Sequence, residues 1–496
     1  MTVLLDRTQA SSEAERDLGP AIRAHPGLGL GLTAFWGLLS VGALVGALFT
    51  DQTLFLVFGW ATCLVVTLPV LDKRYDLVSP WSLVVVTIYI GCGLRPWFIA
   101  REIEGGPRSL DSLFLLGREP AFFTRPSLIF VAGMTLLTIG YLRSGKRPLV
   151  QRPTNSQFTG AAGVLVALCA VIGFVAFVLF AQRTGGFSLE RLSSKRTSIT
   201  GLDLTGYESH GTLRALNELS RYAYWIAVAM FAYGGKRYGL PSVRGFILLV
   251  LFVNAAALPF YASSRSDAAY TLIIGLVIGL CLRPSGGRGT GRAILRGAVV
   301  VTAIISVLTV LRSSATSDFY REGVLVEAIG GTFVYTRSFT DIPTASQTIE
   351  AIPDKLEPAY GSTYLAWAVA PIPRSIWPEK PLVSSGPLIG VKVFGQASSG
   401  VPPGLIAEAF WNFGLGGALL IPPLVGIALR RVYERWRPRL SDPYAVVVYC
   451  GAFMRLGEGV LTGGIGFAVF QALLAWVTLG VLMHIATAPR PEAETG

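Results

Sequence analysis

The charged residues that interrupt the apolar stretches of this chain are few, and they are arginines and carboxylates. An ionisable group inside a membrane is costly, so each is a functional candidate by default. Guanidinium groups bind phosphate through paired hydrogen bonds, and a carboxylate can take a proton from a hydroxyl group. The set predicts a site for a phosphate-bearing ligand, although arginines at such places also anchor to lipid headgroups. In chain order the candidates are Arg95 (GLRPWF), Arg265 and Asp267 (SSRSD), Glu408 (IAEAFWNFG), and Arg455 and Glu458 (MRLGEG).

The sharpest candidate is Arg265, which stands in a short polar turn, Ser263–Ser266, between two apolar stretches. A turn of that length keeps the guanidinium group at the outer membrane surface, beside the start of the next helix. Serine hydroxyl groups and the N–H groups of the helix start add hydrogen-bond donors around it. We therefore predict that Arg265 binds an anion such as phosphate, and that Arg265→Ala abolishes activity. Asp267 is either a second member of this site or a cap of the helix that follows.

A second group of candidates lies between Tyr360 and Pro381, where PIPRSIWPEKP ends a stretch rich in aromatic residues. Its prolines fix the backbone and prevent a helix. A rigid segment that carries Arg374, Trp377 and Lys380 can hold cations and an indole face against a sugar phosphate. The alternative is a rigid connector with solvated charges. Further candidates for substrate binding are Tyr364, Arg337 and His210.

Several motifs of soluble enzymes and metalloenzymes are missing from the sequence. It contains no GxxxxGK[ST], no HExxH, no GxSxG and no DxD. Its five cysteines all fall in apolar stretches without a CxxC pair, which favours core packing over a zinc site. We therefore expect no metal and no cofactor. Such a protein suits a transfer in which the donor already carries its leaving group.

The elements that must position these residues are predicted to be membrane-spanning helices, so the fold class is an all-α polytopic membrane protein. Hydrophobic residues make up 52% of the chain and charged residues 15%, against about a quarter charged in a soluble domain. The net charge of +12 then indicates topology and contact with anionic lipids rather than nucleic acid. About twelve apolar stretches are long enough to serve as spans: 28–49, 53–71, 81–100, 122–141, 159–181, 215–234, 245–262, 267–282, 295–311, 405–429, 443–459 and 464–486.

Lys and Arg cluster in alternate short loops, and the positive-inside rule places these loops and both chain ends in the cytoplasm. Residues 1–27 and 487–496 are then cytoplasmic tails that flank the spans within 28–311 and 405–486. The outer segments are 101–121, 182–214 and, largest, 312–404, which carries aromatic residues throughout and should fold. Loops of that size usually have a function. We therefore predict that the site faces outward.

Four motifs, in this order along the chain, resemble the family of O-antigen polymerases (Wzy-type), or oligosaccharide repeat-unit polymerases. They are Asp76–Pro80 (DLVSP), Ser263–Asp267 (SSRSD), Ile372–Pro381 (IPRSIWPEKP) and Ile406–Gly414 (IAEAFWNFG). The resemblance implies a metal-independent glycosyltransferase of the bacterial inner membrane, with its active site facing outward. It would transfer a growing glycan from polyprenyl pyrophosphate to a hydroxyl group of a new lipid-linked repeat unit.

By this likeness Arg265 and Arg374 would hold the pyrophosphate, and Glu408 would be the base or would fix the acceptor. The residues alone leave the base open among Glu408, Asp267, Asp341 and His210. The implied partners are the lipid-linked oligosaccharide, membrane lipids, and chain-length regulator and flippase proteins. Two other functions compete: a ligase-like transferase with the same donor, and a flippase or transporter of lipid-linked sugars. A transporter should place ionisable residues along a path near mid-membrane, with short loops on both sides.

Overall fold

The computed structural model describes most of the predicted helical part of the chain. The described residues are 26–47, 54–72, 75–97, 118–144, 156–184, 186–187, 211–234, 240–262, 265–282, 339–372, 376–380, 383, 385–395, 400–462 and 464–489. Within them the chain is almost entirely helical. The predicted span 295–311, and most of the predicted outer segments 101–121 and 182–214, lie outside the described residues.

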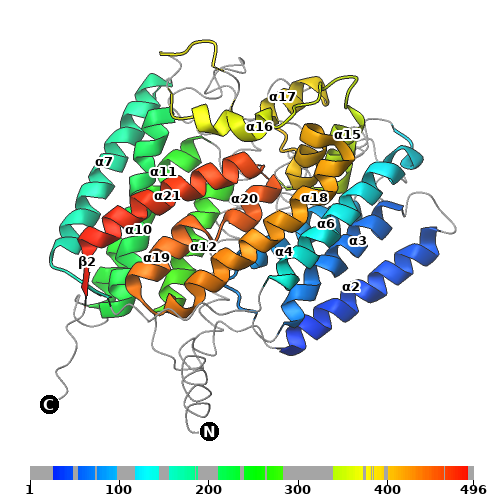
Figure 1. Cartoon of the computed structure of the whole chain (residues 1–496). Helices are drawn as coiled ribbons and strands as arrows, with labels where there is room; N and C mark the ends of the chain where they lie inside the picture. The colour runs from blue at the N-terminus through cyan, green and yellow to red at the C-terminus, as the bar shows by residue number, and fades with distance from the viewer. Residues whose placement is uncertain are drawn as a thin grey trace, which may run out of the picture.

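The helices follow the apolar stretches of the sequence closely, and Figure 1 labels most of them. In chain order the elements are α2 (Pro26–Ala47), α3 (Leu54–Thr67), η2 (Leu68–Leu71), α4 (Pro80–Ile88), η3 (Tyr89–Leu94), η5 (Pro120–Phe123), α6 (Thr124–Arg143), β1 (Ser156–Phe158), α7 (Ala161–Arg183), α10 (Gly211–Gly234), α11 (Pro241–Tyr261), α12 (Arg265–Cys281), α15 (Ile342–Glu350), α16 (Ser362–Leu365), η10 (Ala366–Val369), α17 (Ser385–Lys392), α18 (Gly404–Trp436), η11 (Arg437–Arg439), α19 (Pro443–Ala452), α20 (Leu456–Thr462), α21 (Ile465–Ala486) and β2 (Thr487–Pro489).

Seven segments of the described chain are long and apolar enough to cross a membrane, so this is a multi-pass membrane protein by length and composition. They are Gly27–Ala47, Ala121–Arg143, Ala161–Arg183, Pro241–Tyr261, Gly404–Arg439, Pro443–Thr462 and Ile465–Ala486. α10 is long enough but carries Arg214, Glu218 and Arg221, and α3 and α12 are shorter. The count of about twelve spans stays a prediction.

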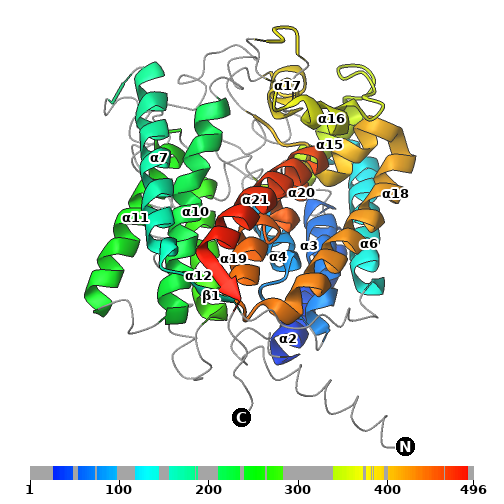
Figure 2. The ribbon, with the colours of Figure 1, turned by 60° about the vertical axis from the view of Figure 1, so that its left-hand side comes forward.

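Two separate hydrophobic cores organise the bundle. Figure 2 shows α7, α10 and α11 on one side of the molecule and α2, α3 and α6 on the other. The first core is formed mainly by α7, α10, α11, α12, α19 and α21, and the second by α2, α3, α4, α6, α15, α18 and α20. α19 and α20 follow each other directly in the chain but contribute to different cores. The link between them, residues 453–455, therefore passes from one core to the other.

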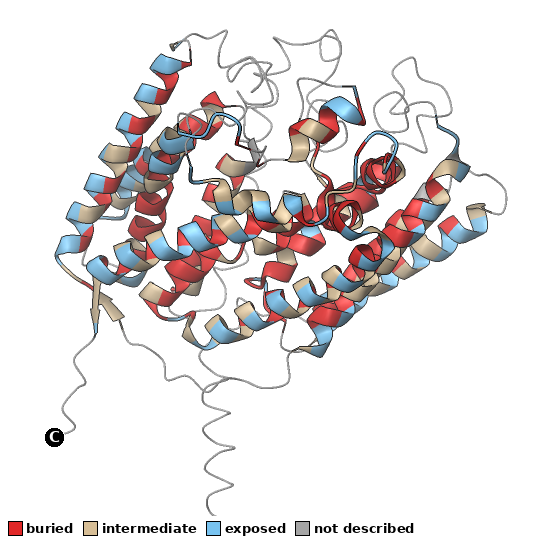
Figure 3. Ribbon diagram, turned by 45° about the horizontal axis from the view of Figure 1, so that its top comes forward, coloured by how far each residue is buried: buried red, intermediate tan, exposed pale blue. Residues whose placement is uncertain are grey.

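The two ends of the bundle differ. α2 begins and α21 ends at one end, whereas α15, α16 and α17 lie at the other (Figure 1). At the first end β2 pairs with β1, with Ala488 opposite Gln157, so part of the predicted C-terminal tail is ordered against a predicted inner loop. At the other end, the described part of the predicted outer segment 312–404 folds and packs on α18. Figure 3 shows buried ribbon at this end in red. One hydrophobic cluster there consists of Ala351, Leu356, Ile389, Val393, Phe394, Val401 and Trp411.

The motif Asp76–Pro80 lies at the same end as the start of α2, and its polar groups hold helices together. Asp76 accepts hydrogen bonds from the Tyr433 hydroxyl group and from Arg437 Nε, the latter at 2.7 Å. Ser79 caps α4 by accepting from the Trp81 N–H group at 3.2 Å. These bonds tie the start of α4 to the end of α18, which indicates a structural role for this motif.

Candidate anion-binding site

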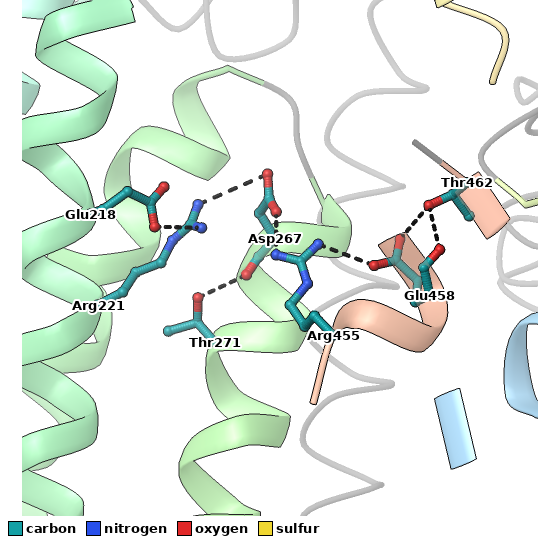
Figure 4. A network of polar contacts seen from close by, with 7 residues as sticks. All are labelled: Glu218, Arg221, Asp267, Thr271, Arg455, Glu458 and Thr462. Atoms are coloured by element: carbon teal, nitrogen blue, oxygen red, sulfur yellow. Dashed lines mark hydrogen bonds and ion pairs between the residues drawn. The ribbon is translucent and has the colours of Figure 1, made fainter. Parts of the chain in front are cut away.

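Five charged side chains of alternating sign lie in a row across α10, α12 and α20 (Figure 4). Arg221 Nη1 donates to Glu218 Oε2 at 3.0 Å, and Arg221 Nη2 lies 3.9 Å from Asp267 Oδ2. Arg455 Nη1 donates to Asp267 Oδ1 at 3.0 Å, and its Nη2 donates to Glu458 Oε2 at 3.4 Å. Each arginine is thus shared by two carboxylates. We call this set the charge chain: Glu218, Arg221, Asp267, Arg455 and Glu458.

The charge chain lies where the two cores meet, and local structure explains each position. Glu218 and Arg221 are three residues apart on α10, the spacing that brings side chains together on one helix face. Asp267 is in the first turn of α12, where a negative charge is favoured by the helix dipole. Arg455 is in the link between α19 and α20 and stacks over the Tyr270 ring at 4.3 Å.

Part of the charge chain is exposed, and one of its donors has no acceptor in the described part of the chain. The side chains of Asp267 and Arg455 are 31% and 28% exposed, so a ligand can reach them. Arg221 is only 9% exposed, and its Nε–H group has no hydrogen-bond acceptor within the described part of the chain. An unmet buried donor costs about 1–3 kcal/mol. That Nε atom has no contact with solvent, so a ligand could approach the charge chain only at Asp267 and Arg455. The set holds three carboxylates and two guanidinium groups, so an anion bound there would need a further positive charge such as that of Arg265.

Arg265 belongs to this neighbourhood by its backbone. The structure ends α11 at Tyr261 and begins α12 at Arg265, so Arg265 is the first helical residue and not part of the turn that the sequence predicted. It stands two residues before Asp267. Its side chain lies outside the described residues, so its role as an anion ligand stays a prediction.

The structure brings together Asp267, Arg455 and Glu458, three of the residues that sequence reasoning selected. It adds Glu218 and Arg221, which sequence reasoning missed although both interrupt the predicted span 215–234. A signal was present, because opposite charges three residues apart in an apolar helix cannot both face lipid. The same argument that selected Arg265 would have found this pair.

Glu408 occupies a different place from the charge chain. It is 2% exposed. Its Oε1 accepts from the Thr363 hydroxyl group at 3.1 Å, and its Oε2 accepts from the Ile465 N–H group at 2.8 Å. No ion pair of Glu408 occurs within the described residues, so hydrogen bonds alone satisfy this carboxylate.

Arg95 is wholly enclosed by the protein, so it does not anchor to lipid headgroups. Its Nη1 contacts the Asp341 carboxylate and also donates to the Phe339 carbonyl oxygen at 3.3 Å, and both charged side chains are 0% exposed. Asp341 caps α15 by accepting from the Thr344 N–H group at 2.7 Å. The pair therefore holds the described part of segment 312–404 onto the end of η3, which indicates a structural role for Arg95 and for Asp341.

The remaining predicted residues lie in or near the outer segment. Trp377 is exposed, and Lys380 is buried, donating to the carbonyl oxygens of Ala370 and Ile372 at 3.3 and 3.1 Å. Burial, and then the charge of Glu408, raise the pKa of the Tyr364 hydroxyl group, so this phenol stays protonated and can donate a hydrogen bond. Three further candidates lie outside the described residues: Arg374, Arg337 and His210.

In the part of the chain that the structure describes, no group of three or more His, Cys, Asp or Glu side chains is placed to hold a metal ion. That activity needs neither metal nor cofactor stays a prediction. Comparison of the chain with protein-family models, with curated proteins and with solved structures found no match. The resemblance to repeat-unit polymerases therefore stays a prediction from the four motifs.

Proposed function

We propose that the chain is a membrane glycosyltransferase that polymerises lipid-linked oligosaccharide repeat units into a cell-surface polysaccharide. The observation that carries the proposal is the charge chain: two arginines shared among three carboxylates, with Arg455 and Asp267 partly open and with Arg265 at the start of the helix that carries Asp267. A pyrophosphate group offers the oxygen atoms that such donors need. The four sequence motifs support the choice of a polyprenyl-pyrophosphate glycan as donor.

In the proposed reaction the acceptor hydroxyl oxygen bonds to the anomeric carbon while the bond from that carbon to the pyrophosphate oxygen breaks. The electron pair leaves with the pyrophosphate, whose negative charge grows. Arg221 and Arg455, with Arg265 at the start of α12, would stabilise this charge. Guanidinium groups already held in place by Asp267 need no rearrangement during the step, which is where most electrostatic catalysis arises.

The proton of the acceptor hydroxyl group must pass to a carboxylate. Asp267 faces two arginines, so we assign to it the positioning of both. Glu218 forms an ion pair with Arg221 alone among the described residues and is 28% exposed. We therefore assign the proton acceptor to Glu218, in place of the bases that the sequence suggested.

One observation favours the transporter alternative. α18 is broken at Phe413 and Gly414, and the predicted span 443–459 is broken between α19 and α20. Interrupted helices of this kind form binding sites in secondary transporters. The large folded outer segment has no evident use in a transporter, so we retain the transferase as the first proposal and the ligase-like transferase as its near relative.

The proposed location is the bacterial inner membrane, with the outer segment outside the cytoplasm. Two exposed positions at opposite ends of the bundle test this orientation: Lys392 at the end of α17 and Arg435 near the end of α18. In intact cells an impermeant thiol reagent should label Lys392→Cys and spare Arg435→Cys. The opposite pattern would remove an outward-facing mechanism.

The experiment that tests the function is the glycan ladder of a strain that lacks this chain. A polymerase predicts loss of long chains with single repeat units retained. Unattached long chains would indicate a ligase, and repeat units confined to the inner leaflet would indicate a transporter. Restoration by the unchanged chain, and its failure with Arg265→Ala or Glu218→Gln, would locate the chemistry at the charge chain.

A further inference from the structure

The motif IAEAFWNFG of α18 holds part of the outer segment in place. Glu408, Trp411 and Asn412 are spaced three and four residues apart, so they share one face of the helix. Trp411 Nε1 donates to the Glu357 carbonyl oxygen at 2.7 Å. Asn412 accepts from the Gly361 N–H group at 2.8 Å and donates to the Thr363 hydroxyl oxygen at 2.7 Å. We call these three α18 residues the outer clamp.

Glu408 extends the outer clamp to a third element. One carboxylate oxygen binds Thr363 of α16, and the other binds the N–H group of Ile465, the first residue of α21. The chain reaches this point through Gly464, whose backbone has φ of +83°. A Cβ atom there would lie 2.6 Å from Glu408 Oε2, so the close approach requires glycine.

The clamp is also connected to the charge chain. Ile465 follows Thr462 by three residues, and the Thr462 hydroxyl group donates to Glu458 Oε1 at 2.8 Å (Figure 4). The link between α20 and α21 therefore joins the helix that carries Glu458 to the residue that Glu408 binds. Glu408 fixes that link from one side and the outer segment from the other.

We infer that Glu408 is a positioning residue that holds residues 357–363 and the start of α21 in register with α18, and not the group that takes a proton. Both carboxylate oxygens are already engaged, and the side chain is 2% exposed. Glutamine can make the same two contacts, because its oxygen can accept from Ile465 and its amide group can donate to Thr363. Shape and hydrogen bonding, rather than negative charge, are then what the site requires.

This inference assigns a role within the proposed function, so its test has one arm that depends on activity and one that does not. The variants are Glu408→Gln, Glu408→Ala and the milder Thr363→Val. The matched control is Glu357→Ala, because only the backbone carbonyl of that exposed residue contacts the clamp. Each variant is also combined with Leu356→Cys, because Leu356 is buried next to residues 357–363. An impermeant reagent then reports whether the introduced thiol is accessible. The control for labelling is the chain that has only its own cysteines.

Glu408→Gln should polymerise within about fivefold of the unchanged chain, since a charge-assisted bond becomes a neutral one. Glu408→Ala should lower the rate of polymer formation about a hundredfold, because residues 357–363 and the start of α21 are misplaced, and it should expose the introduced thiol to the reagent. Thr363→Val should give values between those of the two Glu408 variants. Glu357→Ala should change neither the rate nor the labelling. A loss of about 10²–10⁴ in Glu408→Gln with the introduced thiol still protected would identify a general base and overturn the inference. If Glu408→Ala does not fold, Glu408→Gln and Thr363→Val decide it.

Failure of the proposed function would look different. An unchanged chain that makes no polymer would contradict the proposed function alone. The labelling arm still tests the positioning role: protection of the introduced thiol in Glu408→Gln with its exposure in Glu408→Ala supports it. Equal protection in both would overturn it.

Discussion

Two arginine–aspartate pairs of this protein look alike in sequence but are built differently. Arg95 and Asp341 are both 0% exposed, and they contact each other directly. Arg455 and Asp267 lie 3.0 Å apart but keep 28% and 31% exposure, and each has a second partner of opposite charge. One pair is fully enclosed, whereas the other is open to a ligand on one side.

The difference separates a pair that the fold encloses from a pair that a ligand could reach. A fully buried pair must satisfy itself, because an uncompensated charge in the interior is very costly. A partly open pair at the meeting of two cores can be satisfied either by its neighbours or by a ligand. We therefore predict that Arg455 contributes to activity and that Arg95 contributes to stability.

The largest effect is expected from Arg95→Ala, which leaves Asp341 charged and enclosed. Breaking a buried pair in this way costs about 3–5 kcal/mol of unfolding free energy. Chemical unfolding of the purified protein in detergent measures it. The double variant Arg95→Met/Asp341→Asn removes both charges and keeps an N-cap, so it should be more stable than Arg95→Ala; equal loss in both would show that charge pairing is not the cause.

Arg455→Ala should act mainly on activity. Loss of one preorganised donor typically lowers the rate about 10²–10³-fold, and Arg455→Lys should recover little because an ammonium group lacks the paired donors. Polymer formation by reconstituted protein measures the effect, with unfolding followed in parallel. If Arg455→Ala unfolds as readily as Arg95→Ala, the Arg455–Asp267 pair also serves mainly to stabilise the fold.

Asp267→Asn should have a smaller effect. The amide keeps the size of the side chain but weakens a charge-assisted bond of about 1.5–3 kcal/mol to a neutral bond of about 1 kcal/mol, so activity should fall about tenfold. Because the pair is partly exposed, stability should change by no more than about 1 kcal/mol. Polymer formation and unfolding of the purified variant measure the two effects. Normal activity would mean that Asp267 only stabilises the first turn of α12 and that the arginines are held by other groups.

The smallest effect is expected at a third ion pair, Arg125 and Glu350, in which the arginine is far more exposed than in the other two pairs. Its two charged atoms are 4.0 Å apart, and the Arg125 side chain is 75% exposed. Arg125→Ala should change the unfolding free energy by less than about 0.5 kcal/mol and leave polymer formation unchanged. A large effect on either reading would show that exposure does not rank these pairs.

The sequence by itself determined the helical, membrane-spanning character of this protein, the approximate limits of its helices and the small set of charges worth examining. These properties are local: apolar length predicts a span, and a charge within it stands out. It could not tell Arg95 from Arg455, and it did not select Glu218 or Arg221. Only the tertiary structure decided which charges meet, since Arg95 and Asp341 are 246 residues apart and Asp267 and Arg455 are 188 apart. Partners that distant are chosen by how helices from two cores pack, and no periodicity within one helix records that choice.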